Sequence, residues 1–106
     1  MSRILRFHGT TEGARSLRRH AAEVKRLVAE HGGSQVRVLG STAHGTDGPE
    51  SDIDLLFLPS RTLGLMELVA LERDISTILE RPVDLVAEPA LHPLVKDRVL
   101  AEAVPL

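Results

Sequence analysis

The chain contains no cysteine, tryptophan or tyrosine, and phenylalanine occurs only twice. Without cysteine it has neither a disulfide framework nor thiolate ligands for a metal. Scarce aromatic rings remove the stacking surfaces that single-stranded nucleic-acid binders use. A formal net charge of −2 gives no general attraction to nucleic acid or to an anionic membrane. We therefore expect no direct contact with either of these partners.

Long hydrophobic runs are also missing. No stretch approaches the roughly 18 apolar residues of a membrane span, and the N-terminal segment has no apolar signal-peptide core. Together with the lack of cysteine, this predicts a cytoplasmic protein. Hydrophobic residues still make up 42% of the 106 residues. That share is enough for a single domain, residues 1–106, with an aliphatic core.

Hydrophobic periodicity predicts three helices and three strands. Apolar residues at steps of three and four indicate helices, and short β-branched or continuously apolar runs indicate strands. The expected order is helix 14–31, strand 36–39, strand 51–58, a helix from 63 or 65 to 80, strand 83–86 and helix 94–103. This order indicates an α/β or α+β fold, with helices flanking a small mixed central sheet.

Several apolar positions are expected to form the core of this domain. The core residues we expect are Leu17, Val24, Val28, Ile53, Leu55, Leu68, Ile75 and Val83. In the helix that ends at residue 80, Leu65 and Val69 are expected to extend the same apolar face. The N-terminal residues Ile4, Leu5 and Phe7 leave two alternatives open, a short edge strand or packing against the first helix.

The first helix also carries a set of basic side chains. These residues are Arg15, Arg18, Arg19, Lys25 and Arg26. They form either a phosphate-binding patch or a solvated helix face with acidic neighbours, and the second interpretation is the more common one for such a pattern. The helix is expected to stop at Gly32 and Gly33, since glycine adopts a left-handed cap without steric cost.

The stretch from residue 36 to residue 58 has the clearest chemical pattern. Gly40-Ser41 ends one predicted strand, Asp52 and Asp54 begin the next, and ten residues separate Ser41 from Asp52. Alternation along a strand points both carboxylates to one side, where they can share a magnesium ion. Glycine permits close backbone approach, and we expect Ser41 to cap a short helix whose amides favour an anion. A triphosphate then fits between this turn and the metal.

Asp84 lies on the third predicted strand. If this strand neighbours the second, the Asp84 carboxylate completes the metal coordination or takes a proton from an acceptor hydroxyl. The plainer alternative is structural, because aspartate after Pro-Glu-Ser suits a turn and Asp84 shortly after Pro82 suits a turn or a cap. His8, His20 and His31 have no partner at metal-ligand spacing, so we interpret them as surface or packing residues.

The segment Gly40-Ser41, ten residues and Asp52-Ile53-Asp54 together resemble the signature of the nucleotidyltransferase superfamily that includes DNA polymerase β. With the Asp84 strand and the small size, nearly the whole chain resembles the minimal nucleotidyltransferases, or MNT proteins. The resemblance implies a polymerase β-like nucleotidyltransferase fold. It also implies that Asp52, Asp54 and Asp84 are the metal-binding and catalytic residues, and that Gly40 and Ser41 contact the nucleotide phosphates.

One residue departs from the family pattern. The family commonly has Ala-Arg-Gly in the turn, where this chain has Ala43-His44-Gly45. Histidine is mostly neutral at pH 7 when its pKa is unperturbed, so a fixed positive charge near the phosphates is replaced. His44 can still donate a hydrogen bond to a phosphate, and we count it among the candidate nucleotide-binding residues.

Members of the MNT family are frequently antitoxins paired with a helical HEPN ribonuclease toxin, and they transfer AMP from ATP to a tyrosine of that toxin. The resemblance implies this role here, with ATP as substrate, Mg²⁺ as cofactor and a HEPN toxin as partner. Two alternatives stay open: a non-catalytic antitoxin that neutralises the toxin by complex formation, and a nucleotide sensor without transfer. The chain has little material for a separate acceptor-binding domain, so the acceptor surface is expected from a partner or from oligomerisation.

Overall fold

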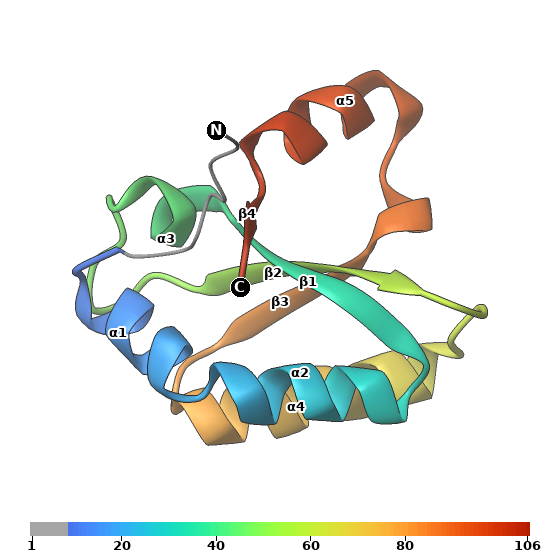
Figure 1. The fold of residues 1–106 in the computed structure, drawn as a ribbon, viewed down its shortest axis with the longest axis horizontal. Coiled ribbons are helices and arrows are strands. Elements are labelled where there is room, and N and C mark those ends of the chain that lie inside the picture. Colours follow the sequence, from blue (N-terminus) through green and yellow to red (C-terminus); the bar gives the residue numbers. More distant parts are fainter. Residues whose placement is uncertain (1–8) are drawn as a thin grey trace, which may run out of the picture.

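The computed structural model describes residues 9–106, which form a four-stranded sheet with helices on both sides (Figure 1). The helices are α1 (Glu12–Arg19), α2 (Ala21–Glu30), α3 (Gly40–His44), α4 (Leu65–Leu79) and α5 (Pro93–Glu102), with the short 3-10 helix η1 (Glu88–Ala90). The strands are β1 (Gly33–Leu39), β2 (Ile53–Pro59), β3 (Val83–Ala87) and β4 (Val104–Pro105). The predicted fold class, a small mixed sheet flanked by helices, is confirmed.

The strand order in the sheet is β3-β2-β1-β4. β2 pairs parallel to β3 and antiparallel to β1, and β1 pairs antiparallel to β4. β2 therefore has a neighbour on each side. Its consecutive residues Leu55, Leu56 and Phe57 are all fully buried, as expected for a continuously apolar central strand.

The main core lies on one face of the sheet, under α1, α2 and α4 (Figure 1). Side chains at alternating positions of β2, Ile53, Leu55 and Phe57, point into this core. Every residue of the predicted core set is buried except Leu68, which packs against the core only in part. That prediction was wrong for Leu68, because the side of α4 that is buried carries Leu71, Ile75 and Leu79.

The stripe of α4 that faces the core differs from the predicted one. Leu71, Ile75 and Leu79 are buried, whereas Leu65 is 75% exposed and Val69 is 38% exposed. The prediction that Leu65 and Val69 extend the apolar face was therefore wrong. Both stripes satisfy the helical period, since Leu71 also stands four residues before Ile75, so spacing alone does not choose between them.

The single helix predicted over residues 14–31 is two helices in the structure. The Thr11 side chain accepts a hydrogen bond from the Ala14 amide at 3.2 Å, so α1 begins two residues earlier than predicted. His20, with φ −106° and ψ 15°, separates α1 from α2. Buried residues continue on both sides of this break, Leu17 before it and Val24 after it, which explains why the periodicity conceals it.

The sheet extends further than the strand patterns predict. β1 begins at Gly33, three residues early, and contains an irregularity next to Gln35, whose φ is +51°. The two-residue strand β4 is too short to give a periodic pattern, yet it pairs with β1, and the Leu106 amide donates to the Val36 carbonyl at 3.0 Å. The residues Ile4, Leu5 and Phe7 lie outside the described part of the chain.

None of the helices within residues 9–106 combines the length and the hydrophobicity needed to cross a membrane.

Gly32 adopts the left-handed conformation, with φ +78°, directly after the last turn of α2. The predicted glycine stop is thereby confirmed. It turns the chain into β1, which leads directly to the segment where the candidate site lies.

Candidate active site

The register of the sheet brings together the aspartates that the sequence singles out. Asp54, the second residue of β2, stands opposite Leu39 of β1 and opposite Asp84 of β3. Neighbouring strands lie about 4.8 Å apart, and residues in register point to the same face. Asp54 and Asp84 are therefore adjacent. Asp52 directly precedes β2 and follows the same alternation, so we define these three residues as the carboxylate corner.

This corner lies on the face of the sheet opposite α1, α2 and α4. Ile53 and Val83 point toward those helices and are buried, so their chain neighbours point the other way. Asp52 and Asp84 are exposed and Asp54 is half-buried. The carboxylate corner is therefore open to solvent, in contrast to the apolar core on the other face.

The ionisation of Asp54 is affected by both burial and charge repulsion at this corner. Partial burial raises the pKa of Asp54 above its ordinary value, and the negative charges of Asp84 and Asp52 raise it further. Both causes act by disfavouring the ionised carboxylate. A divalent cation would offset them, so the electrostatics of the corner suit a site for a metal ion.

The carboxylates of the corner provide only part of a coordination shell for magnesium. Within residues 9–106, no three histidine, cysteine, aspartate or glutamate side chains gather closely enough to hold a metal ion by themselves. Magnesium does not need such a cage, because it usually takes one or two carboxylates together with substrate phosphates and water. Asp52 and Asp54 meet this requirement. The role of Asp84 as a third ligand stays a prediction.

Gly40 stands directly against the corner. Its φ is +63°, and a Cβ atom built there would lie 2.6 Å from Oδ2 of Asp54. A side chain at residue 40 would therefore strain the backbone and displace the carboxylate. Glycine is required at this position both by conformation and by space.

The short helix after β1 starts one residue earlier than predicted. Gly40 is its first residue and the extended Leu39, with φ −118° and ψ 175°, is its N-cap, so Ser41 lies inside α3 and the predicted cap was wrong. The Ser41 carbonyl accepts a hydrogen bond from the Thr46 amide at 2.9 Å. The Ser41 hydroxyl makes no hydrogen bond with another residue of the described chain, which leaves it available to a ligand.

His44 is the last residue of α3, and its side chain is exposed. It forms no hydrogen bond or ion pair with another of the residues 9–106. Gly45, with φ +75°, ends the helix behind it. The structure thus brings Gly40 and the aspartates together, while the contacts of Ser41 and His44 with a nucleotide stay predictions.

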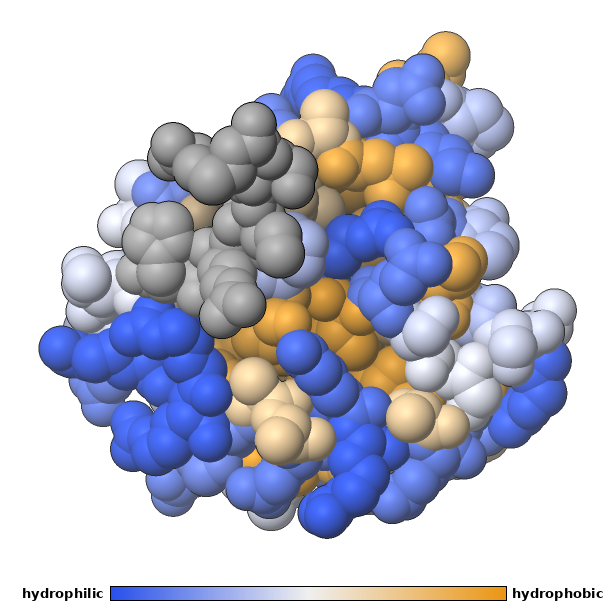
Figure 2. Space-filling view, viewed as in Figure 1, coloured by the Kyte–Doolittle hydropathy of each residue, from blue (hydrophilic) through white to orange (hydrophobic). Residues whose placement is uncertain are grey.

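The basic side chains of the first two helices do not belong to this corner. They are exposed on α1 and α2, on the opposite side of the sheet from Asp54. Figure 2 shows hydrophilic side chains over the lower part of the molecule, where these helices lie, and hydrophobic side chains in the middle and near α5. This arrangement favours a solvated helix face over a phosphate-binding patch.

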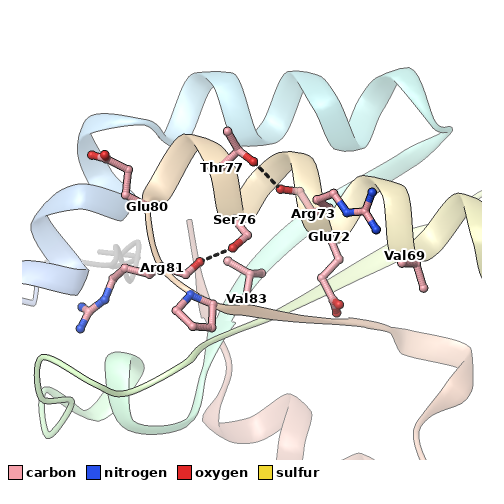
Figure 3. Close-up of a pocket in the computed structure, with 9 residues that line it drawn as sticks. Val69, Glu72, Arg73, Ser76, Thr77, Glu80, Arg81 and Val83 are labelled. Atoms are coloured by element: carbon pink, nitrogen blue, oxygen red, sulfur yellow. Dashed lines mark hydrogen bonds between the residues drawn. The ribbon is translucent and has the colours of Figure 1, made fainter.

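A surface groove of about 540 Å³ runs along α4 beside β3 (Figure 3). Its lining residues are Val69, Glu72, Arg73, Ser76, Thr77, Glu80, Arg81, Pro82 and Val83. Neither Gly40 nor any aspartate of the carboxylate corner belongs to this lining. Concavity therefore does not identify the candidate site.

Two buried polar residues near the corner escape any analysis of local sequence. The Asp47 side chain is 1% exposed and its Oδ2 lies 3.9 Å from Nη1 of Arg81. In the sequence, Asp47 looks like a residue of a glycine-rich turn, and Arg81 looks like the end of a helix before Pro82. Nothing in the spacing connects them, because their contact depends on the tertiary fold.

Comparison with known proteins gives one family match and two similar curated sequences. Residues 17–106 match the family model described as a nucleotidyltransferase domain. A protein of Methanocaldococcus jannaschii, named as a candidate protein adenylyltransferase, is 35% identical over 77% of this chain and 92% of its own length. A second protein of that organism with the same description is 32% identical over 78% of this chain and 83% of its own length.

Solved structures with the same fold give a consistent picture. The structure of a candidate minimal nucleotidyltransferase superposes with a TM-score of 0.78 and 37% identity, covering 87% of this chain and 94% of that one. A toxin–antitoxin structure with AMP-PNP gives a TM-score of 0.71 at 22% identity, covering 79% and 69%. A tri-AMPylated Shewanella oneidensis HEPN toxin in complex with its MNT antitoxin gives 0.66 at 18% identity, covering 83% and 69%. The last two likenesses concern the fold alone.

Proposed function

Because the chain belongs to the nucleotidyltransferase domain family, we propose that it is a Mg²⁺-dependent protein adenylyltransferase, which transfers AMP from ATP to a hydroxyl group of a partner protein. The observation that carries this proposal is the carboxylate corner, where Gly40 leaves space against Asp54 and Asp84 stands in register beside it. The acceptor is a tyrosine of a HEPN-type toxin, for which this chain is the antitoxin. Both curated relatives, at 35% and 32% identity, are named for adenylyl transfer to protein.

Each residue of the site has a distinct task in this proposal. Asp52 and Asp54 would hold magnesium, which would supply positive charge to offset that of the phosphates and of the departing pyrophosphate. Gly40 lets the backbone approach the phosphates closely, and the Ser41 hydroxyl donates a hydrogen bond to a phosphate oxygen. Asp84 takes the proton from the hydroxyl group of the partner protein while the oxygen of that hydroxyl attacks the α-phosphorus. The bond to pyrophosphate then breaks and AMP stays on the acceptor.

The openness of the corner supports a protein as the acceptor. Asp52 and Asp84 are exposed, and the groove along α4 lies elsewhere. A hydroxyl carried on the surface of another protein can therefore reach the α-phosphate without entering a pocket. In this proposal the partner supplies the second wall of the site, which excludes water only in the complex.

A non-catalytic antitoxin is the second candidate. It is favoured by His44, an exposed residue without a hydrogen-bond partner in the described chain, at the place where the family commonly carries arginine. A weaker hold on the phosphates would leave complex formation as the means of neutralising the toxin. Both candidates share the partner and differ in whether AMP is transferred.

The test uses ATP labelled on the α-phosphate. The chain is co-expressed with the protein encoded by its genomic neighbour, and the purified complex receives labelled ATP and Mg²⁺. We expect label on the partner, and a decrease of about 100-fold or more for Asp52→Asn, because the variant removes a charged ligand of the Mg²⁺ that would offset the charge on the reacting phosphates. Asp74→Asn, at an exposed aspartate of α4, is the matched control and should transfer normally.

Two outcomes would redirect the proposal. A stable complex in which neither protein takes up label would support the non-catalytic antitoxin. Equal labelling by Asp52→Asn and by the control would show that the carboxylate corner is not the site of transfer. In the first case, His44→Arg is the next variant to examine.

A further inference from the structure

A buried ion pair lies beside the carboxylate corner and is not part of it. The Asp47 and Arg81 side chains are 1% and 12% exposed, and Oδ2 of Asp47 lies 3.9 Å from Nη1 of Arg81. Neither carboxylate oxygen of Asp47 accepts a hydrogen bond from any residue of the described chain. The pair is thus held together by charge, and Arg81 keeps its hydrogen-bonding groups for another acceptor.

That acceptor belongs to the loop between α3 and β2. Nη2 of Arg81 donates to the Gly48 carbonyl at 2.7 Å. The same carbonyl accepts from the Ser51 amide at 3.2 Å, and the Gly48 amide donates to Ser51 Oγ at 2.9 Å. Gly48 and Ser51 therefore close a turn that ends directly before Asp52. The guanidinium contacts this turn at its first residue.

The backbone next to Arg81 contacts the same segment on the other side of Asp52. The Pro82 carbonyl accepts a hydrogen bond from the Ile53 amide at 2.9 Å. The Arg81 carbonyl is itself fixed by Ser76 Oγ at 2.5 Å. Figure 3 shows Arg81 leaving the end of α4 with its side chain directed away from Ser76. Arg81 and Pro82 thus hold the chain both before and after Asp52.

Gly13 of α1 leaves space for the ion pair between Asp47 and Arg81. A Cβ atom on Gly13 of α1 would lie 2.4 Å from Nη1 of Arg81 and 2.6 Å from Oδ2 of Asp47. The ion pair is therefore packed against the helix backbone and has little freedom to rearrange. A group confined in this way transmits its position to the loop more effectively than a long side chain in solvent would.

We propose that Arg81 is a positioning residue, which holds the turn at Gly48 and thereby fixes Asp52 for the metal and the nucleotide. Asp47 keeps the guanidinium in place. The inference rests on the proposed function, because it concerns the same site. It goes further by assigning the geometry of the corner to a charge pair that touches neither metal nor substrate.

The first measurement is hydrogen exchange in the metal-free protein. Arg81→Met should raise the exchange rate of the Ser51 amide about tenfold, which is the change expected when one charge-assisted hydrogen bond is lost. Amides of β1 should exchange as in the unchanged protein. The matched control is Arg73→Met, at an exposed arginine of α4 whose side chain makes no hydrogen bond within residues 9–106.

The second measurement is Mn²⁺ binding in the presence of AMP-PNP, followed by the electron paramagnetic resonance of free Mn²⁺. Arg81→Met should weaken the binding about tenfold or more, as expected for a residue that orients metal ligands. Arg73→Met should leave it unchanged. Mere loss of stability does not weaken ion binding in protein that remains folded, so this measurement separates positioning from a structural role.

Removal of the guanidinium alone leaves the buried Asp47 charge without compensation, which can prevent folding. The double variant Asp47→Asn with Arg81→Met removes both charges and still lacks the hydrogen bond to Gly48. It should therefore fold and show the same faster exchange and weaker Mn²⁺ binding. If both variants exchange and bind as Arg73→Met does, the positioning role is overturned.

The two measurements also separate this inference from the proposed function. Unchanged protein that binds no Mn²⁺ with AMP-PNP would contradict the nucleotidyltransferase site itself, and the positioning role would fall with it. Unchanged protein that binds Mn²⁺, together with an Arg81→Met variant that binds equally well, would contradict the positioning role alone.

Discussion

The two faces of the sheet differ in the burial and the charge of their side chains. On β3, Val83 and Leu85 point toward the helices and are buried, whereas Asp84 on the other face is exposed and Val86 is half-buried. The helix-covered face carries the main core, whose buried side chains are aliphatic apart from Phe57. On the other face, the carboxylates of Asp52, Asp54 and Asp84 lie close enough together for their charges to raise the pKa of Asp54, in addition to the effect of its partial burial.

This difference separates stability from function. Apolar burial on the first face supplies most of the free energy of folding. On the second face, partial burial and the charges of Asp84 and Asp52 raise the pKa of Asp54, so ionising Asp54 costs free energy. A fold that keeps such a cluster loses stability for the sake of a ligand that will later offset the charge. Shortening a core side chain on the first face and removing a charge at the carboxylate corner should therefore change stability in opposite directions.

The largest effect is expected on the helix-covered face. Leu71→Ala should lower the free energy of unfolding by about 2–5 kcal/mol, because a fully buried leucine is replaced and a cavity remains. Urea unfolding followed by circular dichroism measures this change. Leu65→Ala on the same helix is the matched control, since Leu65 is 75% exposed and should change stability by less than about 0.5 kcal/mol. Equal losses in both variants would contradict the orientation of α4.

A smaller effect of opposite sign is expected at the carboxylate corner. Asp54→Asn should raise the thermal midpoint of the metal-free protein by a few degrees at neutral pH, because it removes a half-buried charge that faces Asp84 and Asp52. The raised pKa also means that the gain should shrink as the pH falls and Asp54 itself becomes protonated. Differential scanning calorimetry against Asp74→Asn measures both trends. A lower midpoint for Asp54→Asn at neutral pH would show that this carboxylate stabilises the fold.

The helix-covered face was also the easier one to predict from sequence. Buried positions such as Val24, Val28 and Ile75 can be predicted from periodicity, because apolar residues at helical spacing share one face, and that face packs against the core. The break at His20 and the exposure of Leu68 were missed. Both depend on tertiary packing, which decides where α1 ends and which side of α4 faces the core.

The sequence predicted that Gly40, Asp54 and Asp84 come together, whereas their role as a site stays a prediction. The close approach of Gly40 to Asp54, and the register of Asp54 with Asp84, agree with a site proposed from residue types and strand positions. Asp47 and Arg81 could not be found in this way. A turn aspartate and a helix-ending arginine are common in any chain, and only the tertiary structure shows that their side chains are buried together.

The smallest effect concerns an ion cluster at the edge of the helix-covered face, where the end of α2 meets the start of α4. Glu67 of α4 accepts two hydrogen bonds from Arg61, at 2.7 and 3.0 Å, and lies 2.8 Å from Nδ1 of His31. The hydrogen bonds to Arg61 are the main cause that lowers the pKa of Glu67, from 4.5 to about 2, and the contact with His31 adds to it. The ionised carboxylate is therefore favoured in the folded protein over the unfolded chain.

The stabilising contribution of Glu67 is present above pH 4.5 and is lost as the pH falls toward about 2, because the unfolded chain takes up the proton first. Glu67→Gln should therefore lower the thermal midpoint slightly at pH values above 4.5. Across the interval from pH 4.5 down to about 2, the difference in thermal midpoint between the variant and the unchanged protein should disappear. The effect is small because solvent screens this exposed cluster. Thermal unfolding of both proteins across the interval measures it, with Glu30→Gln at an exposed position of α2 as the control. A difference that stays constant down to its acid end would mean that Glu67 joins the two helices by packing and not by charge.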